Sequence, residues 1–148
     1  KIDLEILKLL APNSRIHILE ISKKLKVSDK MVSYRIKNLE KKEVIIGYRT
    51  MFDLEKLGYQ YFKMNIYLDN VSEEKNIQFK SFVKRHPNIV YDDEVLGGYD
   101  LEIEFQVKNI QELRLIIDEI ETKFADIIKD YEITSIYKEH KYVFLPVE

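Results

Sequence analysis

The first third of the chain places apolar residues at the spacing of an α-helix in three short stretches. The inward-facing residues of these stretches are Ile2, Ile6, Leu7 and Leu10, then Ile18, Ile21 and Leu25, then Val32, Ile36 and Leu39. Pro12 and Asn13 interrupt the pattern after the first stretch, and Ser28 is a favourable N-cap for the third. The pattern therefore predicts three helices joined by short links.

A strand-like pattern replaces the helical one after Lys42. Residues 44–52 are rich in β-branched and aromatic types on either side of Gly47, which favours extended chain around a turn. We therefore expect a β-hairpin, or wing, over these residues, followed by a short linker.

The remainder of the chain alternates between strand and helix patterns. Strands are expected at residues 61–68, 89–96, 101–107 and 133–137, and helices at 72–85 and 110–124. The order βαββαβ is the ferredoxin-like arrangement, in which two helices cover one face of a four-stranded antiparallel sheet. We therefore expect an α+β protein with a winged helix-turn-helix domain over residues 1–52, a linker over 53–58 and a ferredoxin-like domain over 59–148.

The net charge of −2 conceals two parts of opposite charge. Residues 1–50 carry 12 Lys and Arg against 6 Asp and Glu, whereas residues 51–148 carry 12 against 20. The first part is therefore +6 and the second is −8. Such asymmetry is expected when one part of a protein binds a polyanion and the other does not.

Composition excludes several classes of protein. The chain has no cysteine, so it can hold neither a disulfide nor a thiolate zinc site. No apolar run is long enough to span a membrane or to form the core of a signal peptide. We expect a cytoplasmic protein without a membrane partner.

The third predicted helix has the residue types of a DNA-recognition helix. Its candidate DNA-binding residues are Ser28, Lys30, Met31, Ser33, Tyr34, Arg35, Lys37 and Asn38. Arg can bond to guanine with two N–H groups, and Asn can bond to adenine in the same way. The alternative is an ordinary solvated helix rich in lysine. The short preceding helix, the Ser28 cap and the positive charge favour double-stranded DNA as the partner.

Several segments, taken together, resemble a known family. They are Asp3-Leu4-Glu5-Ile6-Leu7, Arg15-Ile16, Glu20-Ile21, Val27-Ser28, Arg35-Ile36-x-x-Leu39-Glu40, Val44-Ile45-x-Gly47-Tyr48, Leu57-Gly58 and Gly98-Tyr99-Asp100. In order and spacing they resemble the Lrp/AsnC, or feast-famine, transcription regulators across nearly the whole chain. The resemblance implies a sequence-specific DNA-binding regulator that forms homodimers or larger oligomers and responds to an amino acid.

Four positions depart from the pattern of that family. Lys26 and Glu43 stand where the family usually has glycine. If the backbone there keeps a positive φ, each residue costs roughly 1 to 2 kcal/mol. His17 replaces a common N-cap and Ser22 replaces a small alanine, so the second helix is expected to be capped differently.

One face of the predicted sheet is left uncovered by the helices. It would carry Tyr61, Lys63, Asn65 and Tyr67 beside Glu102, Glu104 and Gln106. An antiparallel sheet often keeps one face in water. The family resemblance instead implies that two such sheets pack face to face in a homodimer, and aromatic side chains are common at interfaces.

The turn between the second and third strands is a candidate effector site. Gly97, Gly98, Tyr99 and Asp100, with Thr134 and Ser135 from the fourth strand, would border a small-molecule pocket at a subunit interface. Glycine amides can approach a carboxylate, and Asp100 can accept bonds from an ammonium group, which suits an amino acid. The alternative is a tight turn in which Asp100 bonds to nearby backbone. Spacing alone favours the turn, and the resemblance supports the pocket.

No motif indicates catalysis, a metal or a cofactor. The carboxylates of Asp92, Asp93 and Glu94 cannot easily converge on one ion, because neighbouring side chains of a strand point to opposite faces. His17, His86 and His140 are far apart in sequence. The main rival interpretation is a ligand-sensing or protein-interaction module whose winged helix does not bind DNA, as half of a tandem protein. An enzyme is a more distant third.

Overall fold

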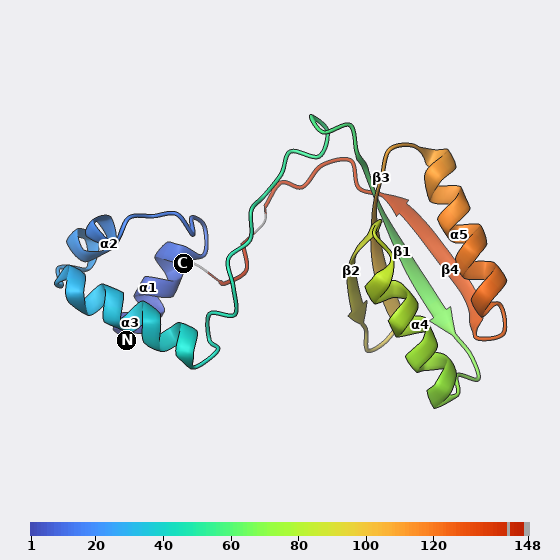
Figure 1. Ribbon diagram of the computed structural model, residues 1–148, viewed down its shortest axis with the longest axis horizontal. Coiled ribbons are helices and arrows are strands. Elements are labelled where there is room, and N and C mark those ends of the chain that lie inside the picture. Colours follow the sequence, from blue (N-terminus) through green and yellow to red (C-terminus); the bar gives the residue numbers. More distant parts are fainter. Residues whose placement is uncertain (142, 147–148) are drawn as a thin grey trace. The chain divides into compact units, whose positions relative to one another are not determined.

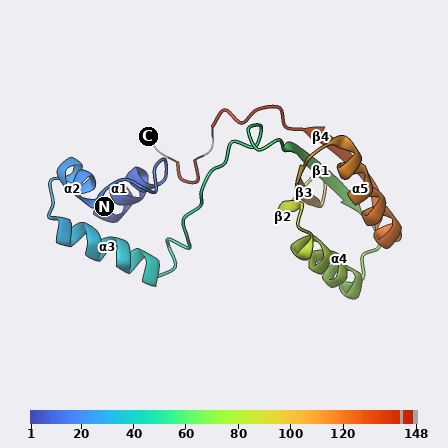
Figure 2. The ribbon, with the colours of Figure 1, turned by 45° about the horizontal axis from the view of Figure 1, so that its top comes forward.

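A computed structural model of the protein describes residues 1–141 and 143–146. The chain divides into two compact units, shown in Figures 1 and 2. The N-terminal unit comprises Lys1–Phe52 together with His140–Glu148, and the C-terminal unit comprises Asp53–Glu139. Within the described residues, no helix is long and apolar enough to cross a membrane.

The three predicted helices of the N-terminal unit are confirmed. They are α1 (Ile2–Leu10), α2 (Ile18–Leu25) and α3 (Asp29–Lys41). Ser28 caps α3, since its Oγ accepts a hydrogen bond of 3.2 Å from the backbone N–H of Met31. Ile6, Ile21 and Val32, one from each helix, form the buried cluster that holds the unit together.

The departures from the family pattern have the predicted backbone consequences. Lys26 ends α2 in the left-handed region with φ 55°, and Glu43 follows α3 with φ 56°. In the part of the chain that the structure describes, no side-chain hydrogen bond caps the N-terminus of α2 at His17. Ser22 is buried, and its Oγ donates a hydrogen bond of 3.0 Å to the carbonyl of Leu19. The hydroxyl that serine adds at this position therefore finds a partner within its own helix.

The β-hairpin predicted over residues 44–52 is wrong, because residues 44–52 form no strand. The segment is instead tied back to α3. The backbone N–H groups of Val44 and Ile45 both donate to the carbonyl of Leu39. The Tyr48 hydroxyl donates to Glu40 at 2.8 Å, and burial, followed by this bond, raises the pKa of Tyr48 to about 12. Residue types that favour strands form one only where a neighbouring strand supplies the pairing.

The βαββαβ order of the C-terminal unit is confirmed. Its elements are β1 (Gln60–Leu68), α4 (Glu73–Arg85), β2 (Ile89–Glu94), β3 (Leu101–Val107), α5 (Ile110–Phe124) and β4 (Ile128–Ser135). The strands form an antiparallel sheet in the order β2-β3-β1-β4. Figure 1 shows α4 and α5 lying along this sheet.

The predicted bounds of the last strand were wrong. The prediction was residues 133–137, whereas β4 runs from Ile128 to Ser135. β4 lies at the edge of the sheet and carries polar residues on much of its length. Its apolar alternation is therefore weak, and pairing with β1 decides where it begins and ends.

The register of β1 against β3 separates a buried face from an open one. Phe62, Met64 and Ile66 lie opposite Phe105, Ile103 and Leu101, and all six are buried against α4 and α5. The intervening residues point to the other face. We call that side the open face; it carries Tyr61, Lys63, Asn65 and Tyr67 from β1 with Glu102, Glu104 and Gln106 from β3, as predicted.

Candidate nucleic-acid interface

The most exposed side of α3 carries three lysines and a tyrosine. We call Lys30, Tyr34, Lys37 and Lys41 the α3 stripe, because their spacings of four, three and four residues align them along the helix. All four are exposed, and Tyr34 is 64% exposed. The stripe thus presents three ammonium groups and a phenol ring to solvent.

Four of the other predicted DNA-binding residues lie beside or before the stripe. Met31 is exposed, whereas Ser33 and Asn38 are half-buried. Asn38 follows Tyr34 by one helical turn, so its amide borders the stripe. The Ser28 hydroxyl is occupied by the cap at the start of the helix.

Arg35 differs from the other predicted DNA-binding residues, because its guanidinium is bonded within the chain. Its Nη1 donates to both carboxylate oxygens of Asp3, at 3.2 and 3.4 Å. Asp3 belongs to α1, so this ion pair joins the first and third helices. Nothing in the local sequence pattern predicts this pair, since its residues are separated by 32 positions.

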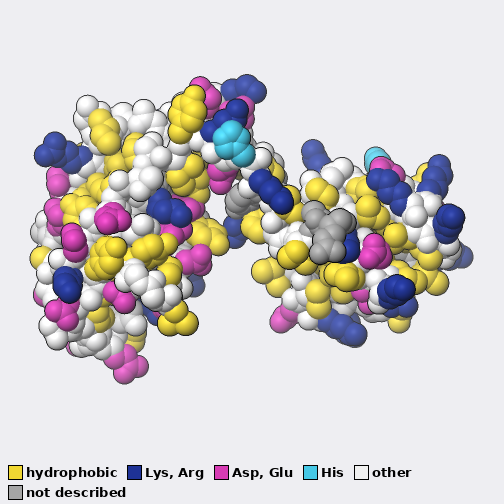
Figure 3. Space-filling model, turned by 180° about the vertical axis from the view of Figure 1, so that it is seen from behind, with side chains coloured by type: hydrophobic (Ala, Val, Ile, Leu, Met, Phe, Trp, Pro, Cys, Tyr) yellow, Lys and Arg dark blue, Asp and Glu magenta, His cyan; other side chains and the backbone are white. Residues whose placement is uncertain are grey.

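Further basic side chains surround these helices. Arg15, Lys23, Lys24 and Lys26 are exposed before, along and after α2. Lys24 forms an ion pair of 2.9 Å with Glu20, and the hydrogen bond from Lys24 lowers the pKa of Glu20. Figure 3 shows Lys and Arg side chains, in dark blue, around the N-terminal unit. The surface of this unit therefore suits a polyanion.

The predicted effector residues fall into two separate groups within one chain. Gly97 and Gly98 each have φ 87° in the turn between β2 and β3, where glycine is favoured. Asp100 accepts a hydrogen bond of 2.8 Å from the backbone N–H of Leu68, as the tight-turn alternative expects. Thr134 lies opposite Lys63, and Ser135 lies opposite Phe62. These positions are five residues or more along β1 from Leu68, or roughly 16 Å at the rise of a strand.

The open face holds a polar network that reaches this turn. Lys63 Nζ lies 2.7 Å from Glu102 Oε1, and the Tyr99 hydroxyl donates to Glu102 Oε2 at 2.6 Å. Burial alone would raise the pKa of Glu102, but the hydrogen bonds from Lys63 and Tyr99 lower it. Tyr61 donates to Glu104. The Oδ1 atom of Asn65 is buried and has no hydrogen-bond partner among residues 1–141 and 143–146.

Further acidic residues, from β2 and β4, also lie on the open face. The register puts Asp93 of β2 opposite Glu102, and Glu132 and Asp130 of β4 opposite Asn65 and Tyr67. The bounds of β4 were needed to find its two residues. Lys63 lies opposite Glu104 and pairs with Glu102, on a face that carries three further carboxylates.

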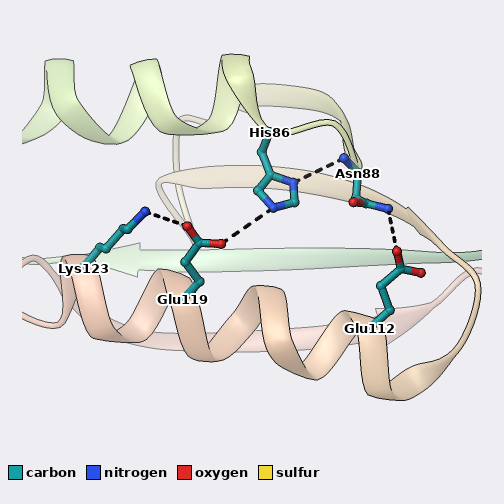
Figure 4. A network of polar contacts seen from close by, with 5 residues as sticks. All are labelled: His86, Asn88, Glu112, Glu119 and Lys123. Carbon is teal, nitrogen blue, oxygen red and sulfur yellow. Dashed lines mark hydrogen bonds and ion pairs between the residues drawn. The ribbon is translucent and has the colours of Figure 1, made fainter.

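Of the residues considered as metal ligands, His86 lies in a polar network between α4 and α5. Among residues 1–141 and 143–146, no three His, Asp or Glu side chains are placed to hold a metal ion. His86, at the end of α4, accepts the Asn88 backbone N–H at 3.2 Å and lies 3.9 Å from Glu119 of α5 (Figure 4). Glu119 also bonds to Lys123, and Asn88 bonds to Glu112. This network joins α4 and the start of β2 to α5.

Comparison with known proteins connects this architecture to a family. Residues 1–46 match the family described as winged helix-turn-helix DNA-binding. The HTH-type transcriptional regulator FL11 of Pyrococcus horikoshii is 30% identical over 118 residues, which cover 80% of this chain and 77% of the relative. The structure of Escherichia coli AsnC superposes with a TM-score of 0.77 at 21% identity, over 97% of this chain and 95% of AsnC. The chain belongs to the Lrp/AsnC family.

Other relatives are consistent with this assignment. The proline dehydrogenase transcriptional activator of Rhodobacter capsulatus is 29% identical over 79% of this chain and 77% of its own length. The transcriptional regulator NMB0573 of Neisseria meningitidis, solved as an L-Met complex, has a TM-score of 0.86 at 19% identity, over 99% of this chain and 95% of that one. The chain is thus a DNA-binding transcriptional regulator of the Lrp/AsnC type, and its homologues are regulators and not enzymes.

Proposed function

We propose that the α3 stripe enters the major groove of DNA and that residues on and beside it recognise the base sequence. The observation that supports this most strongly is the alignment of Lys30, Tyr34, Lys37 and Lys41 on the exposed side of a capped helix. Lysines bind phosphates, whereas an amide and an apolar ring edge can contact bases. We therefore assign phosphate contacts to the lysines and base contacts to Tyr34 and Asn38, with Met31 beside them. A regulator of chromosomal DNA works where the chromosome lies, so we retain the cytoplasm as its location.

Lys37→Ala and Tyr34→Ala should weaken DNA binding in different ways. Lys37→Ala should lower the slope of log affinity against log salt by roughly 1 for all sequences, because one phosphate contact is lost. We use operator for the duplex that the wild-type protein selects from genomic fragments; Tyr34→Ala should cost ~1 to 3 kcal/mol on it and little on unrelated DNA. Fluorescence anisotropy at several salt concentrations measures both effects. Lys84→Ala removes the same charge at an exposed position of α4, outside the α3 stripe, and is the matched control. Wild-type affinity and slope in Lys37→Ala would contradict the proposal.

We further propose that the protein forms homodimers through the open face, with larger oligomers built from them. Half-buried tyrosines lie on this face, and tyrosine is enriched at protein interfaces. The unpartnered Oδ1 of Asn65 supports the same assignment, because a buried polar atom is normally bonded in the complete assembly. Pairing two copies would present two α3 helices to a near-palindromic DNA site.

An amino acid is the effector we propose, bound between subunits. The turn from Gly97 to Asp100 and the pair Thr134 and Ser135 lie apart within one chain. We infer that the turn of one copy meets Thr134 and Ser135 of a second copy. The Gly97 and Gly98 amides would bind the carboxylate, and the hydroxyls would accept bonds from the ammonium group. The L-Met complex of the Neisseria meningitidis regulator is consistent with such a ligand.

A thermal-shift screen of the amino acids tests this site. A ligand at ~100 times its Kd should stabilise the protein by roughly 2.7 kcal/mol. The double variant Thr134→Val, Ser135→Ala should abolish the shift and leave the ligand-free melting temperature nearly unchanged, since both side chains are exposed. Ser14→Ala, at an exposed position of the N-terminal unit, is the matched control. A screen without any shift, or a shift that survives in the double variant, would refute the assignment.

A further inference from the structure

The ion pair between Asp3 and Arg35 is a polar contact that joins α1 to α3. One guanidinium nitrogen, Nη1 of Arg35, lies within hydrogen-bonding distance of both Asp3 oxygens, at 3.2 and 3.4 Å. The two residues are 32 positions apart in sequence, and their side chains are 40% and 43% exposed. The contact therefore lies at the edge of the helix–helix seam, where it is open to solvent on one side.

Arg35 occupies a different side of α3 from the stripe. It precedes Leu39 by four residues and follows Val32 by three, and both of these are buried. Residues with these spacings are neighbours on a helix surface. Arg35 therefore borders the buried seam, while Tyr34 and Lys37 lie around the helix on the exposed side.

The apolar core of the N-terminal unit has a small, fully buried centre, against which partly buried apolar side chains from the three helices pack. Ile6, Ile21 and Val32 form the buried cluster. Apolar contacts are not directional, and helices can rotate or slide a little against them at low cost. A hydrogen-bonded ion pair at the edge of the seam adds a directional constraint between α1 and α3.

We propose that Arg35 is a positioning residue, which together with Asp3 fixes α3 on α1 so that the α3 stripe meets the major groove in one register. Asp3 takes part by accepting the hydrogen bonds from Arg35. The proposal rests on the assignment of DNA reading to the α3 stripe, and it replaces the expectation that Arg35 contacts a base. Its effect on DNA binding passes through the orientation of Tyr34 and Lys37.

Exchange of the two charges separates a positioning role from a DNA-contacting role. If Arg35 touches DNA, Arg35→Asp removes that contact, and adding Asp3→Arg cannot restore it. Asp3→Arg alone should then strengthen binding, because it adds positive charge near a polyanion. If Arg35 only positions α3, each single variant weakens discrimination between operator and unrelated DNA, and the exchanged pair recovers it.

Fluorescence anisotropy measures the affinity of each full-length protein for the operator and for a shuffled sequence. The four proteins are wild type, Asp3→Arg, Arg35→Asp and the exchanged pair. We expect each single variant to lower the ratio of the two affinities by about two- to fivefold, the range of an exposed ion pair. The exchanged pair should return to within about twofold of wild type. Glu5→Arg makes the same charge change on the exposed side of α1 and should not lower the ratio.

Melting temperatures measured in parallel keep the outcome clear if a single variant is poorly folded. An exchanged pair that melts like wild type and still fails to discriminate would overturn the proposal and make Arg35 a DNA contact. Wild-type discrimination in both single variants would overturn it as well. If Tyr34→Ala and Lys37→Ala do not change DNA binding, the assignment of DNA recognition to α3 itself is refuted instead.

Discussion

Ile21→Ala is expected to unfold the N-terminal unit and abolish DNA binding, while the C-terminal unit stays folded. Ile21 is fully buried and belongs to a cluster with Ile6 and Val32. Truncating a buried isoleucine to alanine typically costs about 2 to 5 kcal/mol. A unit this small has only a few kcal/mol of stability, so the loss removes most of it. α3 would then lose the surface that orders it.

Circular dichroism and anisotropy on the operator together check this expectation. The helical signal of α1 to α3 should fall, and DNA binding should drop below detection, whereas a second, separate unfolding transition of the C-terminal unit persists. Leu19→Ala, which truncates a 54% exposed side chain on the same helix, is the matched control and should bind DNA normally. An Ile21→Ala protein that binds the operator like wild type would show that the small core is not what holds α3.

Local patterns predicted the elements whose side chains alternate or recur without interruption. β3 is the clearest case, because Leu101, Ile103, Phe105 and Val107 are buried on one face and the residues between them are not. α3 was predicted from Ser28 onward for a similar reason, since its cap and its apolar positions agree. In both cases the local sequence and the fold favour the same structure.

Prediction failed where a distant partner decides the structure. Residues 44–52 have the composition of a hairpin, yet Val44, Ile45 and Tyr48 bond back to α3. β4 took its bounds from pairing with β1. Likewise, no sequence pattern indicated that Arg35 Nη1 donates to Asp3, which lies 32 positions away. Each of these contacts is non-local, so no window of sequence contains it.

Lys63→Glu is expected to dissociate the proposed homodimer. In a two-fold dimer the open face meets its own copy. Besides Lys63, that face carries five carboxylates, those of Asp93, Glu102, Glu104, Asp130 and Glu132. The register places Lys63 opposite Glu104, and its Nζ pairs with Glu102 at 2.7 Å. Removing one partner of such a pair at an interface typically costs about 2 to 5 kcal/mol, so the dimer Kd should rise at least 30-fold.

The pH dependence distinguishes charge repulsion from general damage to the fold. In the wild type, the pKa of Glu102 is lowered in the folded protein. The ionised carboxylate therefore contributes to folding stability above its unfolded pKa of about 4.3, and this contribution is lost as pH falls through the folded-state pKa. In Lys63→Glu the sign reverses, because a carboxylate beside Glu102 raises both pKa values. Protonation then relieves the repulsion, and the variant should regain dimer as pH falls from 7.5 towards 5.

Sedimentation velocity on the full chain at both pH values measures this effect. Wild type should remain dimeric at 1 µM and pH 7.5, on the order of the concentration at which a stable dimer persists, and Lys63→Glu should be monomeric there. Lys84→Glu makes the same charge change on the exposed surface of α4, away from the open face, and should leave the dimer intact. If Lys63→Glu stays dimeric at pH 7.5, or if Lys84→Glu dissociates equally, the open face is not the surface that pairs two copies. Monomer at both pH values with an unchanged melting temperature would mean that lost packing at position 63, and not repulsion between carboxylates, separates the copies.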